Sequence, residues 1–167
     1  MKTKNLIKGA LAIVLCLLSF MIFRGVTNIL NAFFVPLVLS IFIYNMSLHE
    51  KIAIFLALQI LCFFIFPVQL IFSFFYCVIA FITTYMRQKG IRYFLVWATV
   101  TVCVTLFFYI AVRLTDLIFM TKIYEITLRV MKNNSLIYIF ALFIESIIVS
   151  TLYILIFKKI SSLKFMT

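Results

Sequence analysis

The stretch from Ile52 to Tyr85, IAIFLALQILCFFIFPVQLIFSFFYCVIAFITTY, decides the fold, because its 34 residues carry no formal charge. At a rise of about 1.5 Å per residue, one continuous helix of this length would extend for about 51 Å. The hydrocarbon core of a bilayer is about 30 Å thick, so one crossing needs about 20 residues. Pro67 interrupts the stretch, since proline removes a backbone donor and clashes with the preceding turn. We therefore expect two membrane-spanning helices, over residues 52–66 and 68–86, joined by a tight turn.

Apolar runs separated by short polar clusters continue on both sides of this stretch. They predict further spans at about residues 6–23, 31–46, 93–112 and 135–157, of which the second is short and contains Pro36. The connection over residues 115–131 mixes apolar and charged side chains, with Glu125 and Arg129 four residues apart, so it fits an amphipathic helix at the membrane interface. The sequence thus predicts one all-α transmembrane domain over residues 1–167, a bundle of six helices.

Composition supports lipid as the solvent of this chain. Hydrophobic residues make up 67% of it and charged residues 11%, whereas soluble domains contain about 45–50% and about 25%. The six phenylalanines between residues 63 and 75 are expected to face lipid. The excess of 15 basic over 4 acidic residues would suggest nucleic acid in a soluble protein. Here the basic clusters lie between apolar runs, so anionic lipid headgroups are the expected partner and nucleic acid is not.

The distribution of basic residues tests the number of spans, because cytoplasmic loops carry the excess of Lys and Arg. With six spans and both termini in the cytoplasm, ten basic residues lie inside, namely Lys2, Lys4, Lys8, Lys51, Arg87, Lys89, Arg92, Lys158, Lys159 and Lys164. Five lie outside, namely Arg24, Arg113, Lys122, Arg129 and Lys132. This excess favours six spans. A topology of five spans, which would place Lys158 and Lys159 outside, is the alternative.

The residues that catalysis requires are scarce. An active site needs paired titratable groups or an activated nucleophile, but Glu145 is the one carboxylate within the expected spans and His49 is the only histidine. The four cysteines lie singly in apolar runs without a CxxC pair, so no metal site is expected. Three glycines in the whole chain cannot form a glycine-rich phosphate loop. We predict a protein without enzymatic activity, cofactor or metal.

Glu145 is the most informative single residue, because it falls about ten residues inside the last expected span. A charge near the bilayer centre costs at least about 2.5–3.5 kcal/mol, so the carboxyl must be neutral, paired or in a polar cavity. Candidate partners are Arg24, Arg113, Gln59 and Gln69. Glu145 then belongs either to a ligand or partner site, or to a single buried hydrogen bond that fixes helix packing.

A second polar group occurs in the connection between the first two spans. Asn28 and Asn31 are three residues apart, so one face of a helix can present both, with Arg24 before them. The alternative is a simple interfacial loop. Taken together, the candidate ligand- or partner-binding residues are Arg24, Asn28, Asn31, Gln69, Arg113 and Glu145.

The layout resembles that of one superfamily of membrane proteins. The resemblance rests on the short second span with its FVPLVL stretch at 34–39, the LFIE stretch at 142–145, the long fifth connection and the basic tail. This superfamily contains the S components of energy-coupling-factor vitamin transporters, the rod-shape-determining protein MreD and the YybS-like proteins. S components usually dock through small residues four apart on their first helix, whereas Ala10 is followed here by Val14.

The resemblance implies a non-catalytic, multi-pass subunit in the bacterial inner (cell) membrane. An MreD-like protein would act through contacts with other integral membrane proteins, in a hetero-complex for cell shape and wall elongation. The alternative is the substrate-binding S component of an energy-coupling-factor transporter, which would bind a small molecule such as a vitamin. A small accessory or immunity protein forms a third class.

Overall fold

The computed structural model describes residues 3–23 and 28–162, apart from the side chain of Asn28. Within these residues the chain forms seven α-helices and one short 3-10 turn, without any strand. The elements are α1 (Thr3–Ile22), α2 (Asn28–Ile43), α3 (Leu48–Ile65), η1 (Pro67–Gln69), α4 (Leu70–Gln88), α5 (Tyr93–Phe119), α6 (Ile123–Val130) and α7 (Ser135–Ser162). The all-α class predicted from the sequence is confirmed.

Local sequence signals set the ends of α3. At its start, the Ser47 hydroxyl accepts a hydrogen bond from the Glu50 amide, and the Glu50 carboxylate accepts one from the Ser47 amide. This reciprocal capping box satisfies two backbone donors that a helix start otherwise leaves unpaired. The helix ends at Ile65, and Pro67 opens the η1 turn that leads into α4. The charge-free stretch therefore divides into two helices at the proline.

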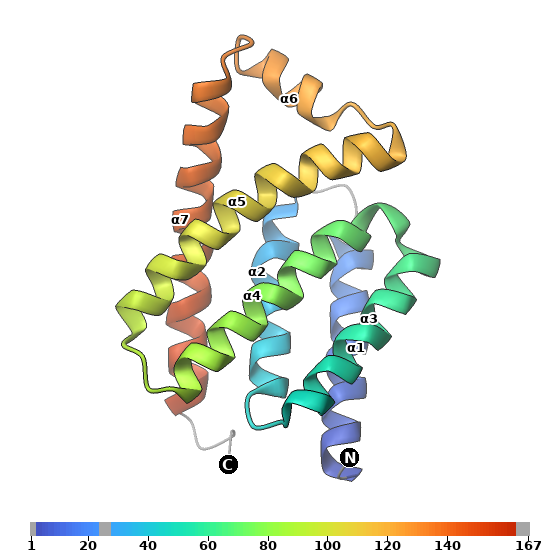
Figure 1. Cartoon of the computed structure of the whole chain (residues 1–167), viewed down its shortest axis with the longest axis vertical. Helices are drawn as coiled ribbons and strands as arrows, with labels where there is room; N and C mark the ends of the chain where they lie inside the picture. The colour runs from blue at the N-terminus through green and yellow to red at the C-terminus, as the bar shows by residue number, and fades with distance from the viewer. Residues whose placement is uncertain (1–2, 24–27, 163–167) are drawn as a thin grey trace.

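The chain runs along the bundle six times, so that α1 begins and α7 ends at the same end (Figure 1). The α2–α3 and α4–α5 connections also lie at this end. We call it the basic end, because Lys and Arg residues gather there. The opposite end carries the η1 turn and α6, which crosses between the ends of α5 and α7. The helix α2 occupies the centre of the bundle, where it contacts α1, α4 and α7.

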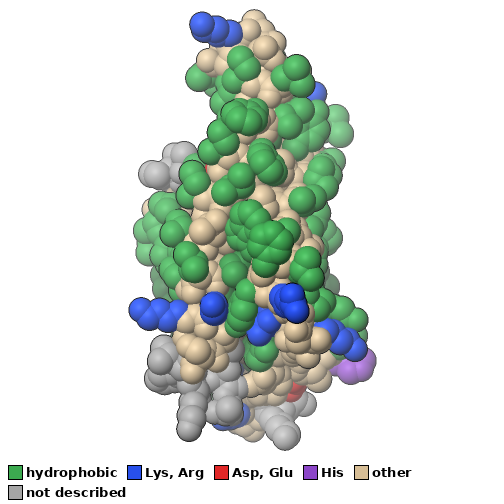
Figure 2. Space-filling model, turned by 90° about the vertical axis from the view of Figure 1, so that its left-hand side faces the viewer, with side chains coloured by type: hydrophobic (Ala, Val, Ile, Leu, Met, Phe, Trp, Pro, Cys, Tyr) green, Lys and Arg blue, Asp and Glu red, His purple; other side chains and the backbone are tan. Residues whose placement is uncertain are grey.

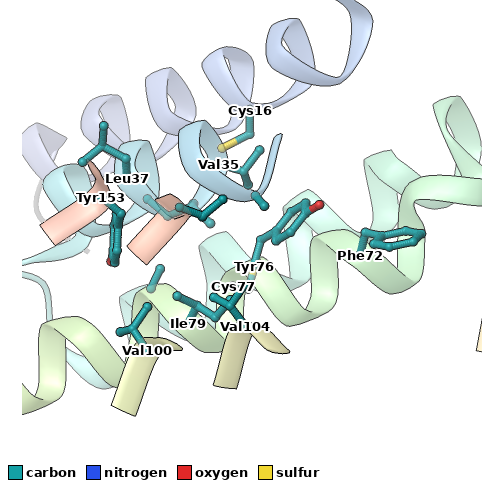
Figure 3. Packing of buried hydrophobic residues seen from close by; sticks show 14 of the residues in the cluster. Cys16, Val35, Leu37, Phe72, Tyr76, Cys77, Ile79, Val100, Val104 and Tyr153 are labelled. Atoms are coloured by element: carbon teal, nitrogen blue, oxygen red, sulfur yellow. The ribbon is translucent and has the colours of Figure 1, made fainter. Parts of the chain in front are cut away.

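The core is formed around α2, which is apolar on all its faces. Val35 and Leu39 are fully covered, and so are two polar side chains of the same helix, Asn31 and Ser40. Figure 3 shows core side chains contributed by the surrounding helices, among them Cys16 of α1 and Tyr76 of α4. A helix that is hydrophobic all round needs burial by its neighbours, and this position provides it.

Five segments are long and apolar enough to cross a membrane, namely Thr3–Ile22, Leu48–Ile65, Pro67–Gln88, Tyr93–Phe119 and Ser135–Ser162. At 16 residues, α2 is shorter than these. The sides of the bundle expose many large apolar side chains, while Lys and Arg gather in a belt near the basic end (Figure 2). These features fit a multi-pass membrane protein.

The largest differences from the expected helix boundaries lie in the region of α5 and α6. The helix α5 continues past residue 112 to Phe119, and the amphipathic helix expected over 115–131 is reduced to α6, Ile123–Val130. The reason is that Met120, with a left-handed backbone (φ 51°), ends α5 one turn beyond the charged residues. Arg113 and Asp116 therefore belong to α5, where contacts with α6 satisfy them.

Candidate functional site

Glu145 lies on the face of α7 that is not covered by the bundle. Its half-buried side chain lines a groove together with Ala141, Ile144 and Ile148 of the same helix and Ile29 of α2. The α7 residues are spaced three and four apart, which places them on one helical face. Among the described residues, the carboxyl group accepts no hydrogen bond and forms no ion pair. The groove therefore contains an acidic group without a hydrogen-bonding partner in the described chain.

Two tyrosines from the core interact electrostatically with this carboxyl. Tyr76 of α4 and Tyr138 of α7 are both buried, with 2% and 3% of their surface exposed. The Tyr138 ring also packs edge-on against Tyr124 of α6 at 5.4 Å between ring centroids. The lining of the groove itself is aliphatic apart from Glu145.

Two of the partners expected for Glu145 are engaged elsewhere. Gln59 accepts a hydrogen bond from the Ser73 hydroxyl at 3.0 Å, within the α3–α4 hairpin. The Arg113 guanidinium stacks on the Tyr124 ring, 3.6 Å from its centroid. Neither therefore pairs with Glu145. Arg24, the third candidate, lies outside the described residues.

The remaining predicted residues occupy separate places. Asn31 is fully buried, and its side-chain oxygen accepts a hydrogen bond from the Ser19 hydroxyl of α1 at 2.9 Å, while its amide nitrogen has no partner among the described groups. Gln69 lies in η1, with its side-chain oxygen buried and unpaired within the described part of the chain. Asn28 begins α2, and its side chain lies outside the described residues. No hydrogen bond or ion pair joins Asn31, Gln69, Arg113 and Glu145 to one another.

Side-chain contacts that were not predicted from the sequence hold the corner between α5 and α6. Asp116 accepts hydrogen bonds from the backbone amides of Ile123 and Tyr124, at 2.9 and 2.8 Å, and from the Thr121 hydroxyl. A carboxylate that accepts from the first amides of a helix caps it and complements its dipole. The Arg113 guanidinium stacks on the ring of Tyr124. The two charged residues of α5 thus hold α6 in place.

The interior of the bundle is closely filled. Between α4 and α5, a void of about 10 Å³ is lined by aromatic and aliphatic side chains, among them Phe72, Tyr76 and Phe108. A second void of about 10 Å³ adjoins Lys51 and Cys77. About 10–15 Å³ is the least space that holds one water molecule, whereas ligand pockets usually enclose about 300–1,000 Å³. These two voids leave no room for a small-molecule ligand.

No known protein family, curated protein or solved structure matches this chain. The chemistry of the site therefore follows from its own side chains. Among the described residues, no three His, Cys, Asp or Glu side chains come together in a manner that could hold a metal ion. The groove instead offers a single carboxyl flanked by apolar side chains, on the side of a membrane-type helix. Such a group can accept a hydrogen bond from, or form an ion pair with, a neighbouring protein.

Proposed function

We propose that this chain is a non-catalytic subunit of a membrane complex, which binds other integral membrane proteins through the outer face of α7. The observation that carries the proposal is Glu145, a carboxyl in the middle of a membrane-type helix without a hydrogen-bonding partner among the described residues. Polar groups in a bilayer are costly and face protein partners or cavities. A helix that donates a hydrogen bond to Glu145 would satisfy it.

The shape of the groove supports a helix as its occupant. The groove is open along the side of the bundle, with Ala141 as the small residue beside Glu145 and Ile144 and Ile148 as apolar borders. Small residues allow two helices to approach closely in a membrane, and interhelical hydrogen bonds add to their association. The groove, at about 410 Å³, is large enough for a small molecule, but it is open along the side of the bundle and not enclosed, which favours a helix as its occupant.

The orientation that goes with this function places both termini in the cytoplasm, with six crossings of the inner membrane. Among the described residues, eight Lys or Arg lie toward the basic end, namely Lys4, Lys8, Lys51, Arg87, Lys89, Arg92, Lys158 and Lys159. Four lie toward the opposite end, namely Arg113, Lys122, Arg129 and Lys132. Since cytoplasmic loops are enriched in Lys and Arg, the basic end is the cytoplasmic one in this proposal.

Within this class, the layout resemblance favours an MreD-like role in cell shape and wall elongation. The alternative is a substrate-binding subunit like the S components of energy-coupling-factor vitamin transporters. The observation that favours the alternative is the pair of unsatisfied amide groups on Asn31 and Gln69, because a ligand could satisfy both. Neither residue is among those that line the Glu145 groove, which is the reason for placing this alternative second.

The test is copurification after crosslinking in native membranes, with the wild-type chain compared with four variants. Glu145→Gln removes the negative charge, and Ala141→Trp fills the groove. The matched controls are Glu125→Gln, which changes an exposed carboxylate on α6, and Val102→Trp, which places the same large side chain on an exposed part of α5. We expect the first two to lose the crosslinked membrane proteins about tenfold, the loss that corresponds to about 1.4 kcal/mol, while the controls retain them.

Unchanged recovery with both Glu145→Gln and Ala141→Trp would reject the proposal, provided that the variants elute as folded protein. Wall-synthesis proteins among the captured partners would support the MreD-like role. Native mass spectrometry decides the alternative: a stoichiometric small molecule that is lost with Asn31→Ala or Gln69→Ala would identify a solute-binding subunit.

A further inference from the structure

The basic end of the bundle brings two cations onto one aromatic ring. Tyr93 is the first residue of α5, and the guanidinium of Arg87, from the end of α4, lies 3.7 Å from the centroid of its ring. The Lys158 ammonium, from the end of α7, lies 5.6 Å from the same centroid. The ends of the consecutive helices α4 and α5 and of the distant helix α7 therefore place two positive groups around a single tyrosine.

These cations are not neutralised by the described part of the protein. Neither Arg87 nor Lys158 forms an ion pair there. The carboxylate at this end is Glu50, which accepts hydrogen bonds from Asn5 at 3.0 and 3.1 Å and caps α3. Two positive groups at one ring repel each other, and their attraction to the ring neutralises neither charge. An anion that contacts both groups would neutralise them.

The donors at this place suit a phosphate. Arg87 uses one N–H group on the carbonyl oxygen of Ile91, which leaves others of its five donors for a ligand. The Tyr93 hydroxyl is hydrogen-bonded to Ser161 at 3.0 Å, and the Ser161 hydroxyl donates to the carbonyl oxygen of Lys158, so both hydroxyls are engaged within the protein. The exposed Arg92 precedes Tyr93. Guanidinium and ammonium groups form charge-assisted hydrogen bonds with phosphate oxygens.

The position along the bundle corresponds to the level of lipid headgroups. Trp97 follows Tyr93 by one helical turn and donates a hydrogen bond to Thr151 at 3.0 Å. Tyrosine and tryptophan concentrate at the membrane–water interface. Beside them, Phe94 is exposed over 70% of its surface, and Figure 2 shows the Lys and Arg belt directly below an apolar face. A phosphate held here could carry acyl chains that run along α5.

We propose that Arg87, Lys158 and Tyr93 form a binding site for one phosphate group at the cytoplasmic interface of the bundle. The site receives the phosphate of an anionic phospholipid headgroup, or a soluble phosphate of the same chemistry. It joins the ends of α4, α5 and α7, so an occupied site would fasten these three helices together. This inference does not depend on the groove at Glu145, which lies on another part of α7.

Trp97 makes the test specific, because it is the only tryptophan of the chain. The purified full-length protein is placed in nanodiscs of phosphatidylcholine with increasing amounts of phosphatidylglycerol that carries brominated acyl chains, which quench tryptophan fluorescence on contact. Brominated phosphatidylcholine in unlabelled phosphatidylglycerol is the reverse arrangement. We expect Trp97 to be quenched by brominated phosphatidylglycerol at lower mole fractions than by brominated phosphatidylcholine.

The variant Arg87→Gln/Lys158→Gln should lower this preference, since each Lys or Arg near an anionic membrane surface contributes about fivefold in affinity. The matched control is Lys89→Gln/Lys159→Gln, which removes two neighbouring exposed charges at the same end and leaves Arg87, Lys158 and Tyr93 unaltered. Arg87→Lys/Lys158→Arg keeps both charges and should keep most of the preference. Circular dichroism of each variant shows that its helices are retained.

Inorganic phosphate at constant ionic strength separates the two sources of the ligand. Recovery of Trp97 fluorescence on its addition would assign the site to soluble phosphate, and persistent quenching would assign it to the lipid headgroup. Equal quenching by the two brominated lipids in the wild-type protein, without any effect of inorganic phosphate, would overturn the proposal. So would a preference that Lys89→Gln/Lys159→Gln lowers as much as Arg87→Gln/Lys158→Gln does.

Discussion

The hydroxyl groups of Ser40 and Tyr153 lie 2.6 Å apart and share a hydrogen bond, although 113 residues separate them in the chain. Both side chains are buried, and the bond joins α2 at the centre of the bundle to α7. Hydrogen bonds between membrane helices contribute about 0.6 kcal/mol on average and up to about 1.7 kcal/mol. This bond is therefore one of the specific contacts that fix how α7 lies on α2.

Ser40→Ala should lower the free energy of unfolding by about 0.6–1.7 kcal/mol, because it leaves the Tyr153 hydroxyl without this partner. The matched control is Ser150→Ala, since Ser150 is equally buried but its hydroxyl has no partner among the described groups. The measurement is reversible unfolding in mixed micelles, followed by circular dichroism. Equal destabilisation by both substitutions would show that the Ser40–Tyr153 bond contributes nothing specific.

Asp116→Ala should release α6 from α5 without unfolding the bundle. The carboxylate caps two backbone amides of α6, and loss of such a cap costs about 0.5–2 kcal/mol. Hydrogen exchange of the peptide that covers residues 121–131 should become faster, while exchange in α4 stays the same. Glu125→Ala is the control, because the exposed Glu125–Arg129 pair contributes little to stability. Slow exchange of α6 in Asp116→Ala would refute the role of the cap.

Glu145→Leu should raise the stability of the isolated protein by about 1 kcal/mol, because a desolvated carboxyl without a hydrogen-bonding partner is costly. The thermal unfolding midpoint in detergent, compared with that of Glu125→Leu, is the measurement. A marked decrease for Glu145→Leu would instead mean that the carboxyl holds the bundle itself together, as in the packing interpretation of this residue. A gain in stability accompanied by loss of copurified proteins fits a contact site.

Labelling of single cysteines tests the proposed topology, including the short helix α2. In a chain with its four native cysteines replaced, Lys4→Cys, His49→Cys and Lys89→Cys should react with a membrane-impermeant maleimide only after the cytoplasmic face is opened. Lys132→Cys should react from outside in intact cells. If α2 did not cross the membrane, the cysteines at positions 4 and 49 would react from opposite faces.

Much of the fold follows from local signals that a sequence displays directly. The charge-free stretch gives two helices at Pro67, because proline lacks a backbone donor and clashes with the preceding turn. Pro36, in contrast, lies inside the continuous helix α2. Ser47 and Glu50, three residues apart, form the capping box at the start of α3. Each of these signals lies within a few residues of the chain, so it can be recognised without knowing how the helices pack.

What the sequence could not display is which face of each helix meets another. The phenylalanines between residues 63 and 75 were all expected to face lipid, and Phe64 does with 76% exposed, but Phe72 is buried at 2%. In a chain that is apolar almost throughout, lipid-facing and core-facing positions have the same composition. The role of Asp116 could not be predicted for a different reason: its backbone partners follow it by seven and eight residues, beyond a turn.

The central place of α2 has a consequence for how the protein is made. Its covering helices include α7, which follows it in the chain after α3, α4, α5 and α6, so one side of α2 stays uncovered until α7 has been made. Until then, lipid, an insertase or a chaperone must cover Ser40 and its neighbours on α2. A nascent chain without α7 would expose this surface to membrane proteases.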